Sequence, residues 1–357
     1  MKVLLIRLRE IGDVVFTTPA VRAIRHHFPH AHISYLVEPV AAPVVQGNPH
    51  IDDVIVAPRR RGARGLKNEI ALVRRIRGEQ FDLVIDFHGG PRASILAWLS
   101  GAPARIGYEV VGRAWMYTTR VARPRELRRR HSVENQWDLL TSLGIAAPSP
   151  EASPVEMPID PAVMQRVEKR LTEAGIGTRD ALIVIHVSAG NPFRRWPLPA
   201  FASVAARLAA ADPSRRIVVT SGPSEREAAD LVIQHARAAM PPETRERVVA
   251  SGDYSLTELR ALVQRAALFV GGDSGPAHVA STSPVPIVTL YGPTLPERSA
   301  PWRPAAFPSE AVDTAGLPCR PCDQRVCEPG DFRCLTRIQP EQVVRAAERV
   351  LEAKQDR

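Results

Sequence analysis

The 357-residue sequence lacks an apolar run of the roughly 18 residues needed to cross a bilayer. Its first apolar segment is interrupted by Arg7, too early for a signal peptide, so we expect a soluble, cytoplasmic protein. Cysteine is scarce, and the four cysteines all lie between positions 319 and 334, which is unlike the disulfide framework of a secreted fold. Hydrophobic residues (45%) and charged residues (24%) are balanced as in globular domains, which excludes global disorder.

Lysine is also scarce, with four among the 47 basic residues, and aromatic residues make up only 5%. Two arginine-rich stretches together carry more positive charge than the net +9 of the whole chain. Residues 59–77 hold eight basic residues and one acid, and residues 120–130 hold six basic residues and one acid. Such stretches favour a nucleic acid, an anionic membrane or an acidic substrate, or they are only solvated faces. No aromatic residue interleaves with them as a base-stacking platform requires, which argues against nucleic acid.

Short apolar strands alternate with helical patterns along both halves of the chain. This rhythm predicts α/β architecture, with two doubly wound parallel sheets covered by helices on both faces. A proline-rich linker at 147–154 separates the halves, so we expect domains at 1–160 and 161–357, with ligands at the carboxyl ends of the strands. Strands are expected over 2–8, 31–37, 54–57, 81–87, 181–187, 216–220, 268–271 and 287–291.

Gly12 and Asp13 follow the first predicted strand, where a glycine permits a tight turn into a helix. No GxGxxG motif accompanies this turn, which argues against an ordinary dinucleotide dehydrogenase. Asp13 is either the N-cap of the next helix or a general base at the carboxyl edge of the sheet. The residues alone leave both interpretations open.

The most specific segment is GGDSGPAH at 271–278, where an apolar strand runs through a turn into a helix with an early proline. The free N–H groups of such a turn favour phosphate, whereas Asp273 suits the hydroxyls of a sugar. The alternative is an ordinary capped helix with His278 in the core. The loop HVSAGNPFRRWP at 186–197 combines small polar residues with arginines that suit a diphosphate, and Glu225 either holds a ribose hydroxyl pair or only initiates a helix.

The cysteines have the spacing Cys319-x2-Cys322-x4-Cys327-x6-Cys334 in a turn-rich segment. Four thiolates at short spacing can hold a structural zinc or iron, and a disulfide or free thiols are the alternatives. We expect any metal to lie far from the sugar chemistry and to have no role in turnover.

Four segments in order resemble glycosyltransferase family 9, the ADP-heptose:lipopolysaccharide heptosyltransferases: IGDVVFTTPAVRAIR, RRWP after HVSAG, DSGPAHVAS, and LYGPT. The resemblance covers residues 1 to about 350. It implies a GT-B fold with two Rossmann-like domains facing a cleft, and metal-independent inverting transfer without a catalytic cofactor. It further implies ADP-L-glycero-β-D-manno-heptose as the donor, and a phosphorylated lipid A–core acceptor at the inner face of the inner membrane, which the protein would contact peripherally.

By position, the resemblance makes Asp13 the catalytic base of the N-terminal, acceptor-binding domain. His88, in the DFHG segment, matches the acceptor-side turn. The two arginine stretches, the first of which contains Arg59, Arg60 and Arg61, would recruit the acceptor. Arg194 replaces the lysine that is usual in the family. The donor-binding residues are then Gly12, Ser188, Arg194, Glu225, Tyr254, Asp273, Ser274, Gly275, Pro276 and His278, with Asp273 at the heptose, Ser274 to Pro276 at the diphosphate and Tyr254 beside the adenine.

Three other functions remain open on the sequence. One is transfer of heptose from ADP-heptose to a protein hydroxyl. The others are non-catalytic: a nucleotide-sugar sensor, or a basic nucleotide- or nucleic-acid-binding protein.

Overall fold

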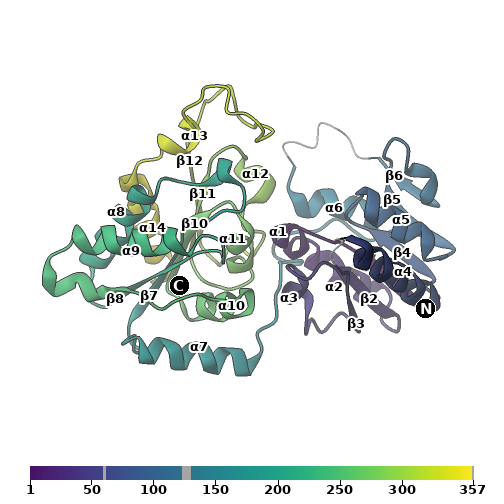
Figure 1. The fold of residues 1–357 in the computed structure, drawn as a ribbon, viewed down its shortest axis with the longest axis horizontal. Helices are drawn as coiled ribbons and strands as arrows, with labels where there is room; N and C mark the ends of the chain where they lie inside the picture. The colour runs from purple at the N-terminus through teal and green to yellow at the C-terminus, as the bar shows by residue number, and fades with distance from the viewer. Residues whose placement is uncertain (59–61, 123–129, 356–357) are drawn as a thin grey trace. The chain divides into compact units, whose positions relative to one another are not determined.

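The computed structural model describes residues 1–58, 62–122 and 130–355, and the chain divides into two compact units, Met1–Pro158 and Ile159–Arg357. Each unit contains a six-stranded, wholly parallel sheet with helices on both faces (Figure 1). The predicted α/β class with two doubly wound sheets is therefore confirmed.

The N-terminal unit has the strand order β3-β2-β1-β4-β5-β6. The bounds are β1 Lys2–Ile6, β2 His32–Val37, β3 Asp53–Val56, β4 Leu83–Asp86, β5 Ala104–Tyr108 and β6 Thr119–Val121. The helices are α1 Ile11–Val15, α2 Thr18–His27, α3 Ala42–Val45, α4 Gly62–Gly78, α5 Pro91–Leu99 and α6 Ser132–Thr141, with the 3-10 helix η1 at Ala114–Met116.

The C-terminal unit has the strand order β12-β11-β10-β7-β8-β9. The bounds are β7 Ala181–His186, β8 Arg215–Thr220, β9 Val248–Val249, β10 Leu268–Gly272, β11 Ile287–Tyr291 and β12 Ser309–Asp313. Its helices are α7 Pro161–Glu173, α8 Leu198–Ala211, α9 Arg226–Ala238, α10 Leu256–Arg265, α11 Gly275–Ala280, α12 Pro296–Ser299, α13 Arg333–Thr336 and α14 Pro340–Gln355, with 3-10 helices η3 Pro192–Arg194 and η4 Pro242–Arg247.

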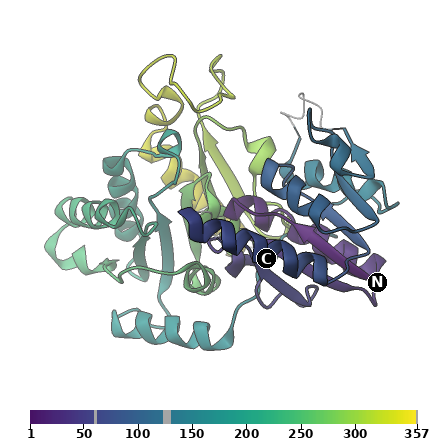
Figure 2. The same cartoon turned by 45° about the vertical axis from the view of Figure 1, so that its right-hand side comes forward.

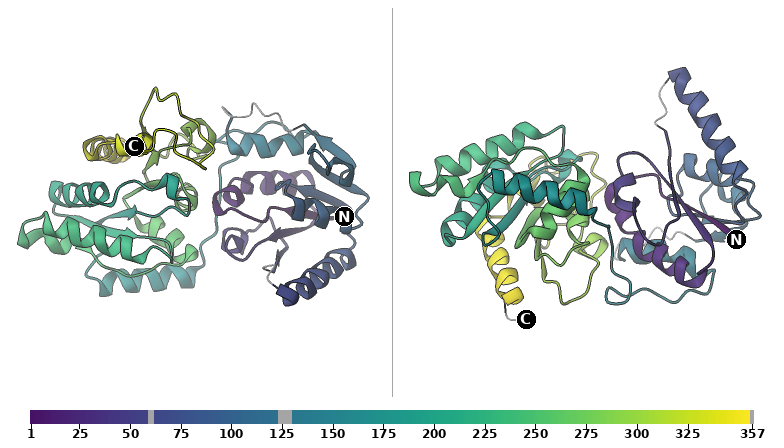
Figure 3. Two further views of the ribbon diagram at one scale, coloured as in Figure 1. Left: turned by 45° about the horizontal axis from the view of Figure 1, so that its top comes forward. Right: turned by 90° about the horizontal axis from the view of Figure 1, so that it is seen from below.

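Continuous burial along the central strands explains why helices cover both faces of the C-terminal sheet. Ile183 and Ile185 of β7 pack in one core with α8, α9 and α14, while Leu182 and Val184 point to the opposite core with α7, α10 and α11. Figures 2 and 3 show these two helix layers from further directions. A strand that is apolar at every position is buried on both sides, which is typical of a parallel sheet.

If the strands of each unit are numbered from one to six along the chain, both sheets have the strand order 3-2-1-4-5-6. The chain therefore changes direction across the sheet between β1 and β4 in one unit, and between β7 and β10 in the other. In open α/β sheets, ligands bind outside the carboxyl ends of the strands at this switch point. The residues that follow these four strands are therefore the candidate site residues.

The observed elements differ from the predicted ones mainly at the sheet edges. Four strands were not predicted: β5, β6, β9 and β12. β9 has two residues, and β6 and β12 lie mostly outside the core, so none of these three edge strands produces an apolar run; in β5, Arg105 and Gly107 interrupt the run. The helical segment that follows β1 consists of two helices, α1 and α2. Within the ranges that the structure describes, no helix is both long and apolar enough to span a bilayer.

Candidate functional site

Asp13 lies in the short helix α1, just beyond β1, at the switch point of the N-terminal unit. The N-cap of α1 is Glu10, so the interpretation of Asp13 as the N-cap is wrong. Its carboxylate forms an ion pair through Oδ2 with Arg7, whose side chain is 10% exposed and also donates from Nη1 to the carbonyl oxygen of Phe87 (2.7 Å). Asp13 itself is 36% exposed, so a fixed carboxylate faces solvent at this edge of the sheet.

The turn after β4 lies at the same switch point and is organised by Asp86. This fully buried carboxylate accepts hydrogen bonds from the backbone N–H groups of His88 (2.8 Å) and Gly89 (2.9 Å) and from the hydroxyl of Tyr117 (2.6 Å). Burial raises the pKa of Asp86. The carboxylate thus fixes the backbone that presents His88.

His88 is a neutral side chain near pH 7. Burial, together with the charges of Arg7 and Arg9, lowers the pKa of His88 to about 4. Its Nδ1 atom is buried and has no hydrogen-bond partner among the residues that the structure describes. A Cβ atom at Gly90 would lie 2.7 Å from the imidazole, so this ring position requires a glycine.

Asp273 follows β10 at the switch point of the C-terminal unit and is the most connected carboxylate there. It is 2% exposed and accepts hydrogen bonds from the hydroxyls of Thr294 and Ser299 (2.9 Å to the latter). Arg194 approaches within 3.3 Å of Oδ2 and donates to the Asp273 carbonyl oxygen (3.1 Å), while His278 Nε2 lies 3.4 Å from Oδ1.

These neighbours determine the protonation of Asp273. Burial alone would raise the pKa of Asp273, but the hydrogen bond and charge of His278, with the charge of Arg194, lower it to about 2. The carboxylate is therefore ionised at neutral pH and directed toward protein donors. Contact between Asp273 and a sugar, expected from the sequence, stays a prediction.

Arg194 ends the 3-10 helix η3 and lies beside this carboxylate with 29% of its side chain exposed. Its Nε donates to Oε1 of Gln324 (2.8 Å), the same oxygen that accepts from Asn191 Nδ2 (2.9 Å). A guanidinium held on two sides retains an exposed surface that suits a phosphate group.

The remaining polar residues at this edge form a second set of contacts around β7. Ser188 accepts from the N–H of Gly222 (2.6 Å) and lies 3.0 Å from Nε2 of His186, whose pKa is lowered by burial to about 4. Glu225 forms an ion pair with Arg195 (2.8 Å). The carboxylate expected to bind ribose is therefore already paired with an arginine.

Two further predicted donor residues differ in how open they are. Ser274 is the N-cap of α11, ahead of Gly275 and Pro276, and its Oγ is buried with no hydrogen-bond partner within the described ranges. Tyr254 is 9% exposed, and one face of its ring lies 4.0 Å from the Arg170 guanidinium. Ser274 therefore has a hydroxyl without a partner among the described residues, whereas only the opposite face of the tyrosine ring is free of Arg170.

The cysteine segment departs from the expectation. All four cysteines are free and half-buried, and no group of three or more His, Cys, Asp or Glu side chains in the described part of the chain is placed to hold a metal. The predicted zinc or iron site is therefore not supported. The segment is also not remote from the candidate donor site, because Gln324 contacts Arg194, and Arg320 donates to the Thr294 carbonyl oxygen (2.8 Å). Residues 130 positions apart can meet only through the tertiary fold, so the sequence did not indicate this proximity.

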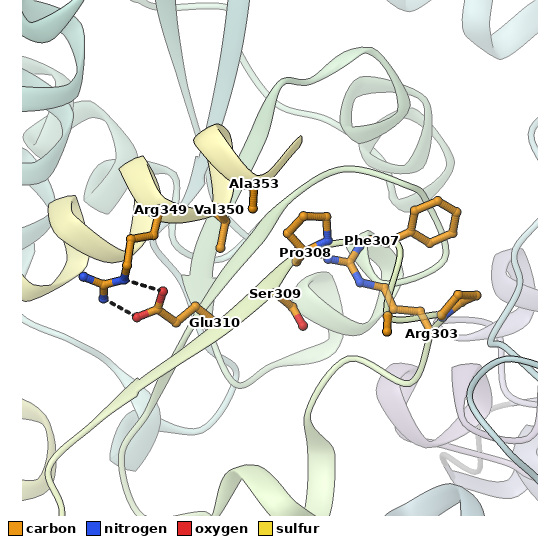
Figure 4. A pocket seen from close by; sticks show the side chains of 10 residues that line it. Arg303, Phe307, Pro308, Ser309, Glu310, Arg349, Val350 and Ala353 are labelled. Carbon is orange, nitrogen blue, oxygen red and sulfur yellow. Dashed lines mark hydrogen bonds and ion pairs between the residues drawn. The ribbon is translucent and has the colours of Figure 1, made fainter. Parts of the chain in front are cut away.

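A surface pocket in the C-terminal unit is separate from these residues (Figure 4). It lies between α14 and the amino end of β12, at the edge of the parallel sheet opposite Asp273, and the Glu310–Arg349 ion pair borders it. Arg303 in its wall donates to the carbonyl oxygens of Ser283 (3.0 Å) and Val285 (2.6 Å). Its guanidinium is thus used to hold the backbone.

Sequence reasoning missed the residues that act through others. Arg7, Tyr117, Ser299 and Gln324 carry no motif, although a basic residue directly after a buried strand was a signal for Arg7. Arg59, Arg60 and Arg61, expected to recruit the acceptor, lie outside the described residues.

Comparisons with known proteins agree with these observations. The profile of "Glycosyltransferase family 9 (heptosyltransferase)" matches residues 70–330. Lipopolysaccharide heptosyltransferase 3 of Escherichia coli is 28% identical over 323 residues, which cover 89% of this chain and 91% of that protein. A glycosyltransferase family 9 structure from Veillonella parvula superposes with a TM-score of 0.83 at 26% identity, covering 98% of this chain and 97% of that one. The E. coli ADP-heptose heptosyltransferase II shares the fold, with a TM-score of 0.77 at 18% identity over 99% of this chain and 100% of its own.

Proposed function

The chain belongs to glycosyltransferase family 9, the heptosyltransferases, and we propose that it transfers heptose from ADP-L-glycero-β-D-manno-heptose to the inner core of lipopolysaccharide. It is therefore a glycosyltransferase with the GT-B fold predicted from its sequence. The acceptor class is supported by the E. coli lipopolysaccharide heptosyltransferase that matches nine-tenths of the chain.

The observation that carries this proposal is the pair of polar sites at the two switch points. The C-terminal site supplies what a nucleoside diphosphate needs: a partly exposed guanidinium at Arg194, and at Ser274 a hydroxyl that has no hydrogen-bond partner within the described residues. Charge accumulates on the ADP leaving group as the glycosidic bond breaks, so a fixed cation there stabilises the transition state more than the ground state. We assign the diphosphate to Arg194 and Ser274.

The N-terminal site supplies the base. In inverting transfer, the acceptor oxygen attacks the anomeric carbon as the bond to ADP breaks, and its proton passes to a carboxylate. Within the described residues, only Oδ2 of Asp13 is engaged, by Arg7, so Oδ1 is the oxygen assigned to receive that proton. Neutral His88, with its unpartnered Nδ1, is assigned to hydrogen-bond an acceptor hydroxyl.

Two measurements test this function. Incubation with ADP-heptose and a panel of truncated core acceptors, followed by mass spectrometry, should show the mass of one heptose added, and a protein acceptor in the panel tests the alternative. Asp13→Asn should lower kcat by at least ~100-fold with donor affinity within a few-fold, since a positioned base contributes ~10²–10⁴-fold.

The matched control is Asp53→Asn. Its side chain is also 36% exposed and also paired with an arginine, Arg75 (2.8 Å), but it lies at the start of β3, the amino edge of the sheet. The control should keep full activity. A near-normal kcat in Asp13→Asn would show that the base is elsewhere, with His88 the next residue to replace.

A further inference from the structure

Four apolar side chains are exposed together on the N-terminal unit, and we call them the tryptophan patch: Ile95, Trp98, Val111 and Trp115. Trp98 and Trp115 are 43% and 55% exposed, and their rings meet edge to face with centroids 5.3 Å apart. Ile95 lies three residues before Trp98 and therefore on the same face of α5. Val111, in the turn before η1, is 97% exposed. Exposed apolar clusters of this kind mark interaction surfaces.

One of the two indole N–H groups of the patch has a partner within the protein. The indole N–H of Trp115 donates to the carbonyl oxygen of Gly112 (3.2 Å). A ring whose donor has a partner within the protein can enter an apolar medium without leaving that donor unpaired, which would be costly. The Trp115 ring is therefore compatible with insertion into lipid.

Two arginines lie next to η1, which carries Trp115. Arg105 is fixed against η1 by a hydrogen bond from Nε to the carbonyl oxygen of Met116 (2.8 Å), and Arg113 reaches the carbonyl oxygen of Gly89 (3.3 Å). Arg120 is exposed on β6, and the acidic residue of the same segment is Glu109. Residues 105–120, which include Val111 and Trp115, thus hold three arginines and one acidic residue, a positive excess.

We propose that the tryptophan patch docks on an anionic bilayer, with its aromatic rings at the interface and its arginines on the headgroup phosphates. Tryptophan is enriched at membrane interfaces, and basic residues are attracted to anionic leaflets. Four side chains are far fewer than the roughly 20–30 residues per partner of a stable dimer, so shallow insertion fits the size of the patch better than self-association. The Arg113–Gly89 contact joins the patch to the turn that presents His88.

This docking rests on the proposed function only in its purpose, which is to bring the enzyme to a lipid-anchored acceptor. The binding itself can be measured without donor or acceptor. The other three tryptophans, Trp137, Trp196 and Trp302, are at most 8% exposed, so intrinsic fluorescence reports mainly on the patch. Vesicles of equal parts phosphatidylglycerol and phosphatidylcholine should shift the emission to the blue, and brominated lipid should quench it, whereas pure phosphatidylcholine should have a much weaker effect.

Replacing both patch tryptophans, Trp98→Gln with Trp115→Gln, should weaken partitioning onto the anionic vesicles by at least about tenfold, measured by sedimentation. Val111→Glu should also weaken it, and because Val111 is almost fully exposed, this variant tests the surface even if the double variant folds poorly. The control is Leu231→Gln, an equally exposed apolar residue (42%) on α9 of the other unit.

Two outcomes would overturn the assignment: partitioning that is unchanged in the patch variants, or a concentration-dependent dimer that these variants abolish without any vesicle binding. Activity on a water-soluble, lipid-free acceptor should be unchanged in all of them. Loss of that activity in the wild type would refute the proposed function instead, so the two failures are distinguishable.

A different observation carries a second inference, about Gln324. Its Oε1 accepts hydrogen bonds from Arg194 Nε and Asn191 Nδ2. Its backbone has a φ of 61°, a conformation that residues other than glycine rarely adopt. We infer that Gln324 is a positioning residue, which directs the outer edge of the Arg194 guanidinium toward the diphosphate. This inference rests on the proposed role of Arg194.

Gln324→Ala should raise the donor KM and the Kd for ADP in parallel, by about 5- to 20-fold, and leave the acceptor KM unchanged. If Gln324 acts through Arg194, adding Gln324→Ala to an Arg194→Ala variant should have no further effect. The control is Gln264→Ala, a glutamine whose Oε1 likewise accepts from an arginine, Arg260 (3.0 Å), outside this site. The assignment would be overturned if Gln324→Ala weakened ADP binding equally in the wild type and in Arg194→Ala, or in neither. If Arg194→Ala itself did not alter ADP binding, the proposed function would be refuted instead.

Discussion

Replacing Asp273 by asparagine tests whether this carboxylate anchors the donor site through protein contacts. In the fold it accepts from Thr294 and Ser299 and faces Arg194 and His278. Asparagine keeps the shape but carries no charge, and its amide would place a donor against these donors. Arg194 would then lose its counter-charge.

The magnitude follows from the pKa. The fall in the pKa of Asp273 from 3.8 to about 2 corresponds to about 2–3 kcal/mol of stability, at ~1.4 kcal/mol per pH unit. Because the folded pKa is the lower one, this stability is fully present above about pH 4 and is lost as the pH falls toward 2. Leaving buried donors unpaired adds about 1–3 kcal/mol, so we expect Asp273→Asn to cost about 3–6 kcal/mol at pH 7.

Hydrogen–deuterium exchange with mass spectrometry measures this cost within one unit. Peptides from β10 and β11 should exchange at least ~100-fold faster in the variant, since each ~1.4 kcal/mol is tenfold, while peptides from the N-terminal unit serve as the internal reference. Asp180→Asn is the control, because Asp180 is also paired with an arginine, Arg216 (3.2 Å), but is more exposed at 18%. It should cost less than about 1 kcal/mol.

One result would refute this reasoning. If Asp273→Asn left exchange in β10 unchanged yet abolished binding of the heptose donor, the carboxylate would serve the sugar rather than the fold. Unchanged exchange with unchanged binding would leave Asp273 with neither role.

Four further outcomes are expected. Arg194→Ala should lower kcat/KM by about 10- to 1,000-fold, whereas the control Arg216→Ala, which lies outside the candidate site, should leave it unchanged. An effect of Arg194→Ala below twofold would show that another residue binds the diphosphate. Gly107→Ala should destabilise the N-terminal unit in thermal unfolding, because its Cβ would lie 2.3 Å from the buried Tyr117 ring; an unchanged Tm would contradict this packing. Burial raises the pKa of Cys334, so thiol labelling near pH 8 should be slowest there, and faster labelling at Cys334 than at the other cysteines would disagree. Removing the charges at positions 59–61 should raise the acceptor KM, less so at high salt, and a low-salt KM equal to that of the wild type would count against recruitment.

The sequence determined the architecture because local and repeating features encode it. Continuous apolar strands such as 181–187 separated by helical patterns require a parallel sheet buried on both faces, and this requirement does not depend on distant contacts. The motifs also marked the correct turns, since Asp13 and Asp273 both follow strands that border a switch point.

The role of each side chain in these turns was decided only by the tertiary structure. Asp13 is paired with Arg7 instead of capping a helix, and Asp273 is surrounded by protein donors instead of open to solvent. The cysteine segment, expected to be remote, reaches Arg194 through Gln324. Hydrogen bonds and ion pairs depend on distances of a few ångströms between residues far apart in the chain, and periodicity and spacing carry no information about those distances.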